Sequence, residues 1–201
     1  MATTASPNGL RPINLIGGLP FAGSTRSFKI ASGYATNIFF GDLVAVDATS
    51  GTLVKVTATG VDGTTNAFPA GVVGVFLGVE YTEPNLKYLL HDQKWTGGTV
   101  VPDAKAYVCD DPSALFTIQA SGSVAQTALG ANISVIQNAG SLVTGNSKVA
   151  ANSAGTGAET FRPLRIVGFV ESTTSQPGDA FTDLIVKFNH GIHSYMSGTG
   201  V

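Results

Sequence analysis

Short runs of alternating apolar and polar residues, separated by turn-forming residues, extend along most of the chain. Val54, Val56 and Ala58 alternate with polar neighbours, which is the pattern of a strand with one buried face. An earlier β-type run covers residues 40–47, and the residues from 47 to 51 favour a turn. We therefore predict an antiparallel hairpin formed by residues 40–47 and 53–58.

A third apolar run, residues 71–79, predicts a longer strand. Gly74 and Gly78 lie within it, and a glycine inside a strand indicates a bulge or the close approach of another backbone. Strict alternation places four apolar side chains on the face opposite these glycines: Val73, Val75, Leu77 and Val79.

Further short strands are predicted along the rest of the chain. Residues 95–98 and 110–113 are predicted turns, and the second of these joins two strands that we expect to pair with one another, 104–109 and 115–120. No segment shows sustained helical amphipathicity, so the predicted fold class is all-β, an antiparallel β-barrel or sandwich. The remaining predicted strands cover residues 86–90, 133–136, 164–171 and 184–189.

The N-terminal residues 1–28 predict an extended arm, because Pro7, Pro12 and Pro20 exclude a long helix. An arm with so much apolar surface is expected to dock on something, either its own domain or a neighbouring subunit. Its apolar side chains are Leu10, Ile13, Leu15, Ile16, Leu19 and Phe21.

Residues 121–160 differ in kind from the strands around them. They are mostly small and polar, with many glycines and serines, and they predict a long loop or finger that leaves the core. This gives a β-rich core from 29–120 and 161–190, an insertion at 121–160 and a C-terminal tail at 191–201.

Composition limits the possible partners. The chain has 201 residues, enough for one domain, and only 12% of them are charged, about half the usual share of roughly 25%. Such a chain is expected to hide surface against partners, or to rely on Thr, Ser and Asn for hydration. The net charge is 11 − 13 = −2, which provides no basic field for nucleic acid. No apolar run reaches the ~18 residues of a membrane span, and the N-terminus lacks the features of a signal peptide.

Residues that could carry chemistry are few, and none forms a convincing set. His190 and His193 are separated by Gly191-Ile192 after a predicted strand, which does not favour a metal site. His91 and Asp92 are adjacent on a predicted strand and should point to opposite faces, so they do not form a catalytic pair. The single cysteine, Cys109, excludes an internal disulfide.

Cys109 is also expected to have a raised thiol pKa, because it lies beside Asp110 and Asp111. No catalytic, metal-binding or cofactor-binding residue is therefore predicted, and no cofactor is expected. Among the large aromatic residues, Trp95 beside Gly97-Gly98 is the candidate for capping a pocket or an intersubunit seam.

Several stretches together resemble the capsid decoration, or cement, proteins of marine tailed bacteriophages, including cyanophages and pelagiphages. The similarity spans most of the chain and is structural, without a catalytic motif. The stretches are Gly9-Leu10-Arg11-Pro12-Ile13, Gly17-Gly18, Ser24-Thr25-Arg26, residues 30–42 (IASGYATNIFFGD), residues 107–112 and 116–120, and Lys187-Phe188-Asn189-His190.

This resemblance implies a structural protein on the outer surface of an icosahedral phage head. Its partners would be the major capsid protein and itself, most simply as a homotrimer, with no direct contact to nucleic acid or membrane. It would hold the shell against the pressure of packaged DNA, after assembly in the host cytoplasm. In this interpretation Arg11 and Arg26 pair with carboxylates of the partner. The arm is anchored by Leu10, Ile13, Leu15, Ile16 and Phe21.

Two other classes of binding protein stay open from the sequence. A glycan- or receptor-binding β module of a phage fibre or surface adhesin would have a concave aromatic site near Trp95. The other class is a major shell or tail-tube subunit. The missing long helix disfavours the usual major capsid fold, and a tail tube predicts open-ended polymerisation. An enzyme is the class that we expect least.

Overall fold

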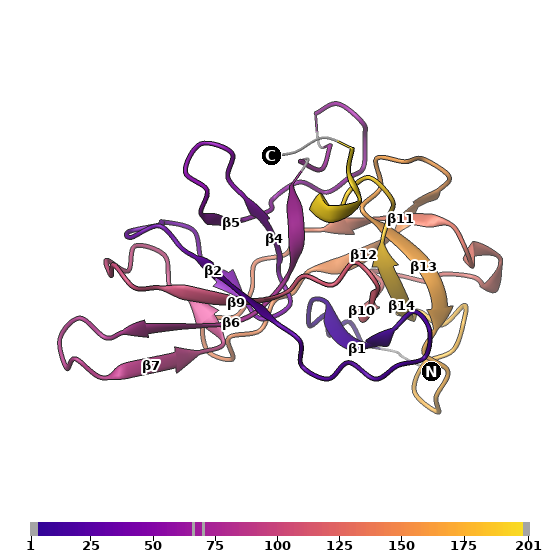
Figure 1. Cartoon of the computed structure of the whole chain (residues 1–201). Coiled ribbons are helices and arrows are strands. Elements are labelled where there is room, and N and C mark those ends of the chain that lie inside the picture. Colours follow the sequence, from indigo (N-terminus) through magenta and orange to yellow (C-terminus); the bar gives the residue numbers. More distant parts are fainter. Residues whose placement is uncertain (1–3, 66, 70, 199–201) are drawn as a thin grey trace.

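Two antiparallel β-sheets make up most of the computed structural model, which describes residues 4–65, 67–69 and 71–198 (Figure 1). Every pairing between its named strands is antiparallel. The only described helices are two 3-10 turns, η1 (Gln126–Ala128) and η2 (Ser194–Met196). The all-β prediction is therefore confirmed, with an architecture consistent with a sandwich.

Sheet A has six strands and contains both the first strand of the chain and the last. An isolated bridge between Ala120 and Ala151 brings β12 (Ala150–Gly157), the strand at the far edge of the sheet, back towards β10 (Ala114–Gln119). The sheet therefore curls on itself. In spatial order its strands are β1 (Arg11–Leu15), β10 (Ala114–Gln119), β14 (Asp183–Phe188), β13 (Leu164–Phe169), β11 (Asn132–Ile136) and β12 (Ala150–Gly157).

Sheet B also has six strands, and a separate two-stranded sheet lies beside it. The separate sheet pairs β3 (Ile38–Phe39) with β8 (Lys94–Trp95). Strand β7 (Leu89–Asp92) pairs with one end of β6, and together they form a hairpin that projects from the body (Figure 1). The path of sheet B is β2 (Arg26–Lys29), β9 (Lys105–Cys109), β6 (Val72–Thr82), β4 (Leu43–Val46) and β5 (Leu53–Lys55).

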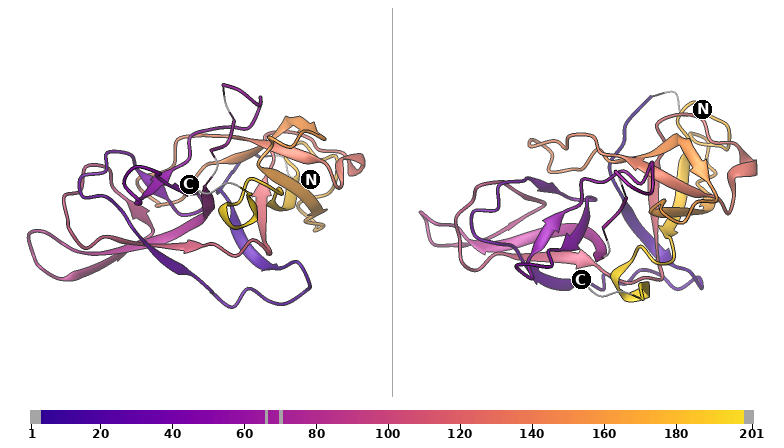
Figure 2. Two further views of the ribbon diagram at one scale, coloured as in Figure 1. Left: turned by 45° about the horizontal axis from the view of Figure 1, so that its top comes forward. Right: turned by 90° about the horizontal axis from the view of Figure 1, so that it is seen from above.

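The central strands of sheet B, β4 and β6, are buried on both faces, and Figure 2 shows the two sheets as neighbouring lobes. One face shares a core with sheet A, where Leu43 and Val75 meet Phe116 and Phe188. The other face packs against a second core that includes Phe76 and the segments around β3 and β8. Because two cores share one sheet, more of the chain is buried and less of its surface is left for charged residues.

Strand β6 serves both cores because its alternation is interrupted twice. Its pairing shifts register opposite Val44/Ala45 and again between Phe76 and Gly78. As a result Val75 points into the core shared with sheet A, whereas Val73 points into the second core. The prediction that Val73, Val75, Leu77 and Val79 share one face was therefore wrong.

The glycines inside β6 behave as predicted. A side chain at Gly74 would overlap the backbone carbonyl of Cys109, and Gly78 lies at the second register shift. These positions permit the close approach and the bulge that put the strand between two cores.

The predicted hairpin at residues 40–58 is confirmed, with Val44 paired to Lys55 and Val46 to Leu53. The strands predicted at 104–109 and 115–120 are also present, as β9 and β10. Their expected pairing was wrong, because β9 belongs to sheet B and β10 to sheet A. The turn at 110–113 therefore carries the chain from one sheet to the other.

The segment 121–160 is only partly the excursion that its composition predicts. Strand β11 was foreseen at 133–136, but β12 was not, and both strands belong to sheet A. Ile133, Val135 and Ala151 lie in the shared core. Small residues suit β12 because side chains at Gly155 and Gly157 would meet Ser134 and Glu159. The connection at 137–149 remains a loop, and residues 121–131 contain only the 3-10 turn η1.

The N-terminal arm docks on its own domain within this single chain. Its first strand, β1, pairs with β10 at the edge of sheet A, and its second, β2, pairs with β9 at the edge of sheet B. Residues 1–3 of the predicted arm and 199–201 of the predicted tail lie outside the described residues. The arm thus fastens the two sheets to one another.

The arm crosses residues 40–42 at a very small separation. Leu10 N–H donates to the carbonyl of Gly41 at 3.0 Å, and Gly41 N–H donates to Phe76 O at 2.8 Å. Gly9 and Gly41 have φ values of +70° and +91°, and a side chain at Gly9 would meet Gly41 O and Ser147 at 2.6 Å. Only glycine fits both the conformation and the space.

Asp42, beside this crossing, is a fully buried carboxylate with three partners. Its Oδ2 atom accepts from Phe39 N–H at 2.9 Å and lies 2.7 Å from Lys55 Nζ. Its Oδ1 atom accepts from the Ser147 hydroxyl at 2.6 Å. One side chain therefore ties β3, β5 and the 137–149 loop together.

Replacing Asp42 with alanine should lower the free energy of unfolding by about 3–5 kcal/mol, because it leaves the Lys55 ammonium buried without a counter-charge. Denaturant titration followed by circular dichroism measures this change. The control is Asp47→Ala, which removes a carboxylate that bonds the turn residue Ser50. Equal losses of unfolding free energy in the two variants would show that the Asp42 cluster stabilises the fold no more than the turn carboxylate of Asp47 does.

Candidate functional site

The outer face of sheet A is the candidate binding surface. Along β14 the side chains of Leu184, Val186 and Phe188 enter the core, so those of the alternate residues point outward. The outward residues of this strand are Asp183 at one end, Ile185 in the middle and Lys187 towards the other end. A hollow lies at each end of this face.

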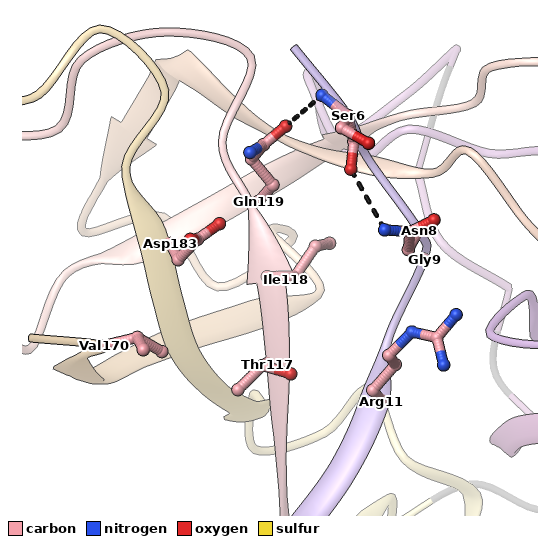
Figure 3. Close-up of a pocket in the computed structure, with 9 residues that line it drawn as sticks. All are labelled: Ser6, Asn8, Gly9, Arg11, Thr117, Ile118, Gln119, Val170 and Asp183. Atoms are coloured by element: carbon pink, nitrogen blue, oxygen red, sulfur yellow. Dashed lines mark hydrogen bonds between the residues drawn. The ribbon is translucent and has the colours of Figure 1, made fainter. Parts of the chain in front are cut away.

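The first hollow, of about 250 Å³, lies between the arm and β10 (Figure 3). Figure 3 shows Arg11 on the arm and Asp183 on β14, on opposite sides of β10. Gln119 accepts from Ser6 N–H at 2.6 Å and so holds the start of the arm against the strand. Burial raises the pKa of Asp183, opposed by hydrogen bonds from Gln119 and Ser175.

Arg11 in this hollow is engaged by its own chain. Its guanidinium donates to Asn146 Oδ1 at 3.1 Å and stacks over the Phe40 ring at 5.1 Å. The predicted pairing of Arg11 with a partner carboxylate therefore competes with contacts that already hold the arm to residues 40 and 146.

The second hollow, of about 370 Å³, lies at the other end of the outer face, between β13, β14, η2 and the arm. Its walls are partly apolar and its charged residues are basic. Six of its lining residues are Ile16, Leu129, Arg165, Lys187, His190 and Met196.

Two of the predicted partner-binding residues are fully buried, Leu10 and Trp95. Trp95 donates its indole N–H to Tyr34 O at 3.0 Å and meets the Tyr81 ring edge-on at 5.8 Å. Trp95 is therefore a core residue, and the expectation that it caps a pocket or lines a sugar site was wrong. Leu10 anchors the arm to its own core, and not to a partner.

The other apolar arm residues divide into two groups. Leu15 and Phe21 pack against the shared core. Ile13, Ile16 and Leu19 are 38%, 45% and 65% exposed. The structure thus selects Ile13 and Ile16 from the predicted anchor residues, and Leu19 with them, as side chains that a partner could reach.

Arg26 already has a carboxylate partner in this chain. Its Nε atom lies 3.0 Å from Asp110 Oδ2, which also accepts from the Tyr195 hydroxyl at 2.9 Å. Arg26 therefore pairs with a carboxylate of its own chain, in the turn between β9 and β10, and not with the expected carboxylate of a partner subunit. This contact ties the C-terminal tail to the edge of sheet B.

The two C-terminal histidines have different surroundings. His190 is exposed at the second hollow, whereas His193 is buried between the rings of Phe188 and Tyr195. His193 Nδ1 accepts from Tyr195 N–H at 3.2 Å. Among the described residues no three His, Cys, Asp or Glu side chains gather in a way that could hold a metal ion.

Cys109 is buried, and burial is the main reason why its thiol pKa rises to about 11. The neighbouring carboxylates of Asp110 and Asp111, on which the sequence argument relied, add smaller contributions. The direction of the shift was predicted correctly, but its main cause was not.

Arg165 and Lys187 were missed as site residues. Both lie on strands that the sequence predicted, at positions that alternate with core residues. That alternation could have shown that both point outward. It could not have shown that the two strands are neighbours, which depends on pairing between distant segments.

Comparison with protein-family models, curated proteins and solved structures found no match to this chain. In the part of the chain that the structure describes, no helix is long and apolar enough to cross a membrane. The surface of the molecule is therefore the main structural evidence that bears on its function.

Stability should fall as the pH is lowered from 7 towards 5, because of His193. Burial lowers the pKa of His193 below its ordinary value of 6.5, against the opposing effect of Asp110 and Asp111. Below about pH 6.5 the unfolded chain takes up a proton that the folded chain resists, so folding loses free energy. Denaturant titrations at several pH values measure the slope of the free energy of unfolding against pH.

The variant His193→Asn keeps an acceptor for Tyr195 N–H and should flatten this slope, whatever its absolute stability. His190→Asn, at an exposed position, should leave the slope unchanged. A slope that persists in His193→Asn would assign the pH dependence to another group.

Proposed function

We propose that this protein binds the outer surface of an icosahedral phage head and cements major capsid protein subunits against the pressure of packaged DNA. The observation that carries the proposal is the apolar surface of the docked arm. Ile13, Ile16 and Leu19 stay exposed on hydrogen-bonded backbone. Ile13 lies in β1, Ile16 N–H donates to Ser113 O at 2.9 Å, and Leu19 O accepts from Leu15 N–H at 2.8 Å. An ordered apolar patch of this kind is typical of a protein–protein interface.

Two further projections of the molecule also expose large apolar residues. The tip of the β6–β7 hairpin presents Leu86, Tyr88 and Leu89. The 137–149 loop presents Leu142 and Val143, the latter 95% exposed. A subunit that contacts several neighbours on a shell needs such separate contact points, and many modest contacts together give strong attachment.

Two motifs that carry the resemblance to decoration proteins also support the proposal. The stretches 9–13 and 30–42 are distant in sequence, yet they meet where Leu10 bonds to Gly41. Their residues build the crossing that positions the exposed arm. The resemblance therefore rests on residues with a defined structural task.

The proposed assembly is a homotrimer on the capsid surface. Light scattering on the purified protein measures its mass, with and without empty heads of the phage that encodes it. A discrete small oligomer that co-sediments with the heads supports the proposal. A protein that leaves the heads unoccupied overturns it.

The double variant Ile13→Ser/Ile16→Ser should weaken binding to heads by about tenfold, because a partner can bury only the exposed 38% and 45% of these side chains, which is worth about 0.6–1.3 kcal/mol each. Co-sedimentation with empty heads at increasing protein concentration measures the occupancy. Leu15 and Phe21 are left unchanged because they pack against the shared core.

The matched control is Val61→Ser/Val100→Ser, which changes two exposed apolar residues outside the arm and the other proposed contact points. Circular dichroism should show both double variants folded. If the arm variant occupies heads as fully as the unchanged protein, the arm is not the anchor.

A further inference from the structure

Two cations face each other on the outer side of sheet A. Arg165 on β13 and Lys187 on β14 are directly paired in the register of the two strands. Like charges at directly opposite positions destabilise a sheet. Neither side chain contributes to the core, which is filled by the alternate residues on both strands.

The pair has no counter-charge among the described residues. Arg165 makes a hydrogen bond to Asn132 Oδ1 at 3.0 Å, and neither cation takes part in an ion pair with a described carboxylate. Five other cations are each paired with a carboxylate, whereas no ion pair among the described residues includes Arg11, Lys29, Lys87 or Lys148. Lys29 also lies directly opposite another cation, Lys105, but there Lys105 has Glu80 as its counter-charge. The five pairs are Arg26 with Asp110, Lys55 with Asp42, Lys94 with Asp92, Lys105 with Glu80, and Arg162 with Glu159.

Aliphatic side chains stand beside the two cations. The same hollow is lined by Ile16 from the arm, Leu129 after η1, and Met196 in η2. Ile16 and Leu129 are about half exposed, at 45% and 50%. The hollow therefore combines a basic pair with an apolar wall, and its described lining includes no carboxylate.

We propose that this hollow binds an extended acidic segment of the capsid partner, with a carboxylate over Arg165 and Lys187 and an aliphatic side chain against Ile16 and Leu129. This inference rests on the proposed function, and it adds the chemistry of the segment that is recognised. Arginine presents a fork of donors that matches a carboxylate, and the lysine supplies a second charge beside it.

A protein segment fits this hollow better than nucleic acid does. A duplex requires a wide basic field, whereas the chain carries a net charge of −2 and the basic pair is local. The apolar wall also needs an aliphatic partner, which a phosphate backbone does not provide.

The first test uses the peptide acetyl-Glu-Leu-Glu-Leu-Glu-amide as the probe, with its Gln-Leu-Gln-Leu-Gln counterpart as the control. NMR titration of the labelled protein should show saturable shifts for amides of β13, β14 and residues 129–130 with the acidic peptide. The glutamine peptide should bind at least about fivefold more weakly, as expected for the loss of exposed charge pairs. Binding should also weaken as salt is added.

The variants Arg165→Gln and Lys187→Gln should each weaken binding of the acidic peptide by about two- to fivefold. The matched control is Lys29→Gln, because Lys29 is an exposed strand lysine on sheet B, away from the hollow. Equal affinity for the two peptides, or equal effects of Lys29→Gln and Lys187→Gln, would overturn the inference.

A stability measurement tests the basic pair independently. Lys187→Glu places an acid opposite Arg165, so it should raise the midpoint of thermal unfolding at low salt while it abolishes binding of the acidic peptide. A lowered midpoint, with binding retained, would show that the two cations do not repel one another and do not form the site.

Head binding separates this inference from the proposed function. If the Arg165→Gln/Lys187→Gln protein occupies heads normally, the hollow is not the contact and the proposed function stands. If the unchanged protein binds the acidic peptide at the hollow but leaves heads unoccupied, the hollow is an acidic-segment site and the capsid role fails.

Discussion

The buried carboxylate of Asp42 is the interaction on which the rest of the structure depends. It neutralises Lys55, accepts from Phe39 N–H and holds Ser147, so segments more than a hundred residues apart meet at one side chain. The arm crosses directly beside it, through Gly9 and Gly41. A charge can stay buried only when its partners are complete, so the correct position of each of these segments is a condition for the others.

This junction explains how a weakly charged chain keeps an exposed apolar arm in a fixed place. Leu10 is buried in the core beside the crossing, whereas Ile13 in β1 and Ile16 just after it remain exposed at the edge of sheet A. The arm is thus ordered within the single chain. The proposed association with a partner would therefore cost less conformational entropy than the folding of a free tail.

Local sequence patterns predicted individual strands, whereas contacts between distant segments decided which strands pair and which side chains are buried. The hairpin at 40–58 was predictable because its alternation and its turn lie within one short segment. The pairing of β9 and β10 was not, because a turn such as Asp110–Ser113 can join strands within a sheet or between sheets. Hydropathy alone could not separate buried Leu10 from exposed Ile13, since the crossing at Gly41 decides it. The burial of Trp95 likewise depends on Tyr34 and Tyr81, which are distant in sequence.

The arm that begins with β1 and ends with β2 has a mechanical consequence. Because β1 lies antiparallel along β10 and β2 along β9, tension along the arm acts parallel to both strands. The interstrand hydrogen bonds of each pair are then loaded together in shear, and not opened one after another from an end. A load applied at the exposed loop between these strands is therefore shared by both sheets. The segment from β1 to β2 resists extension for this reason.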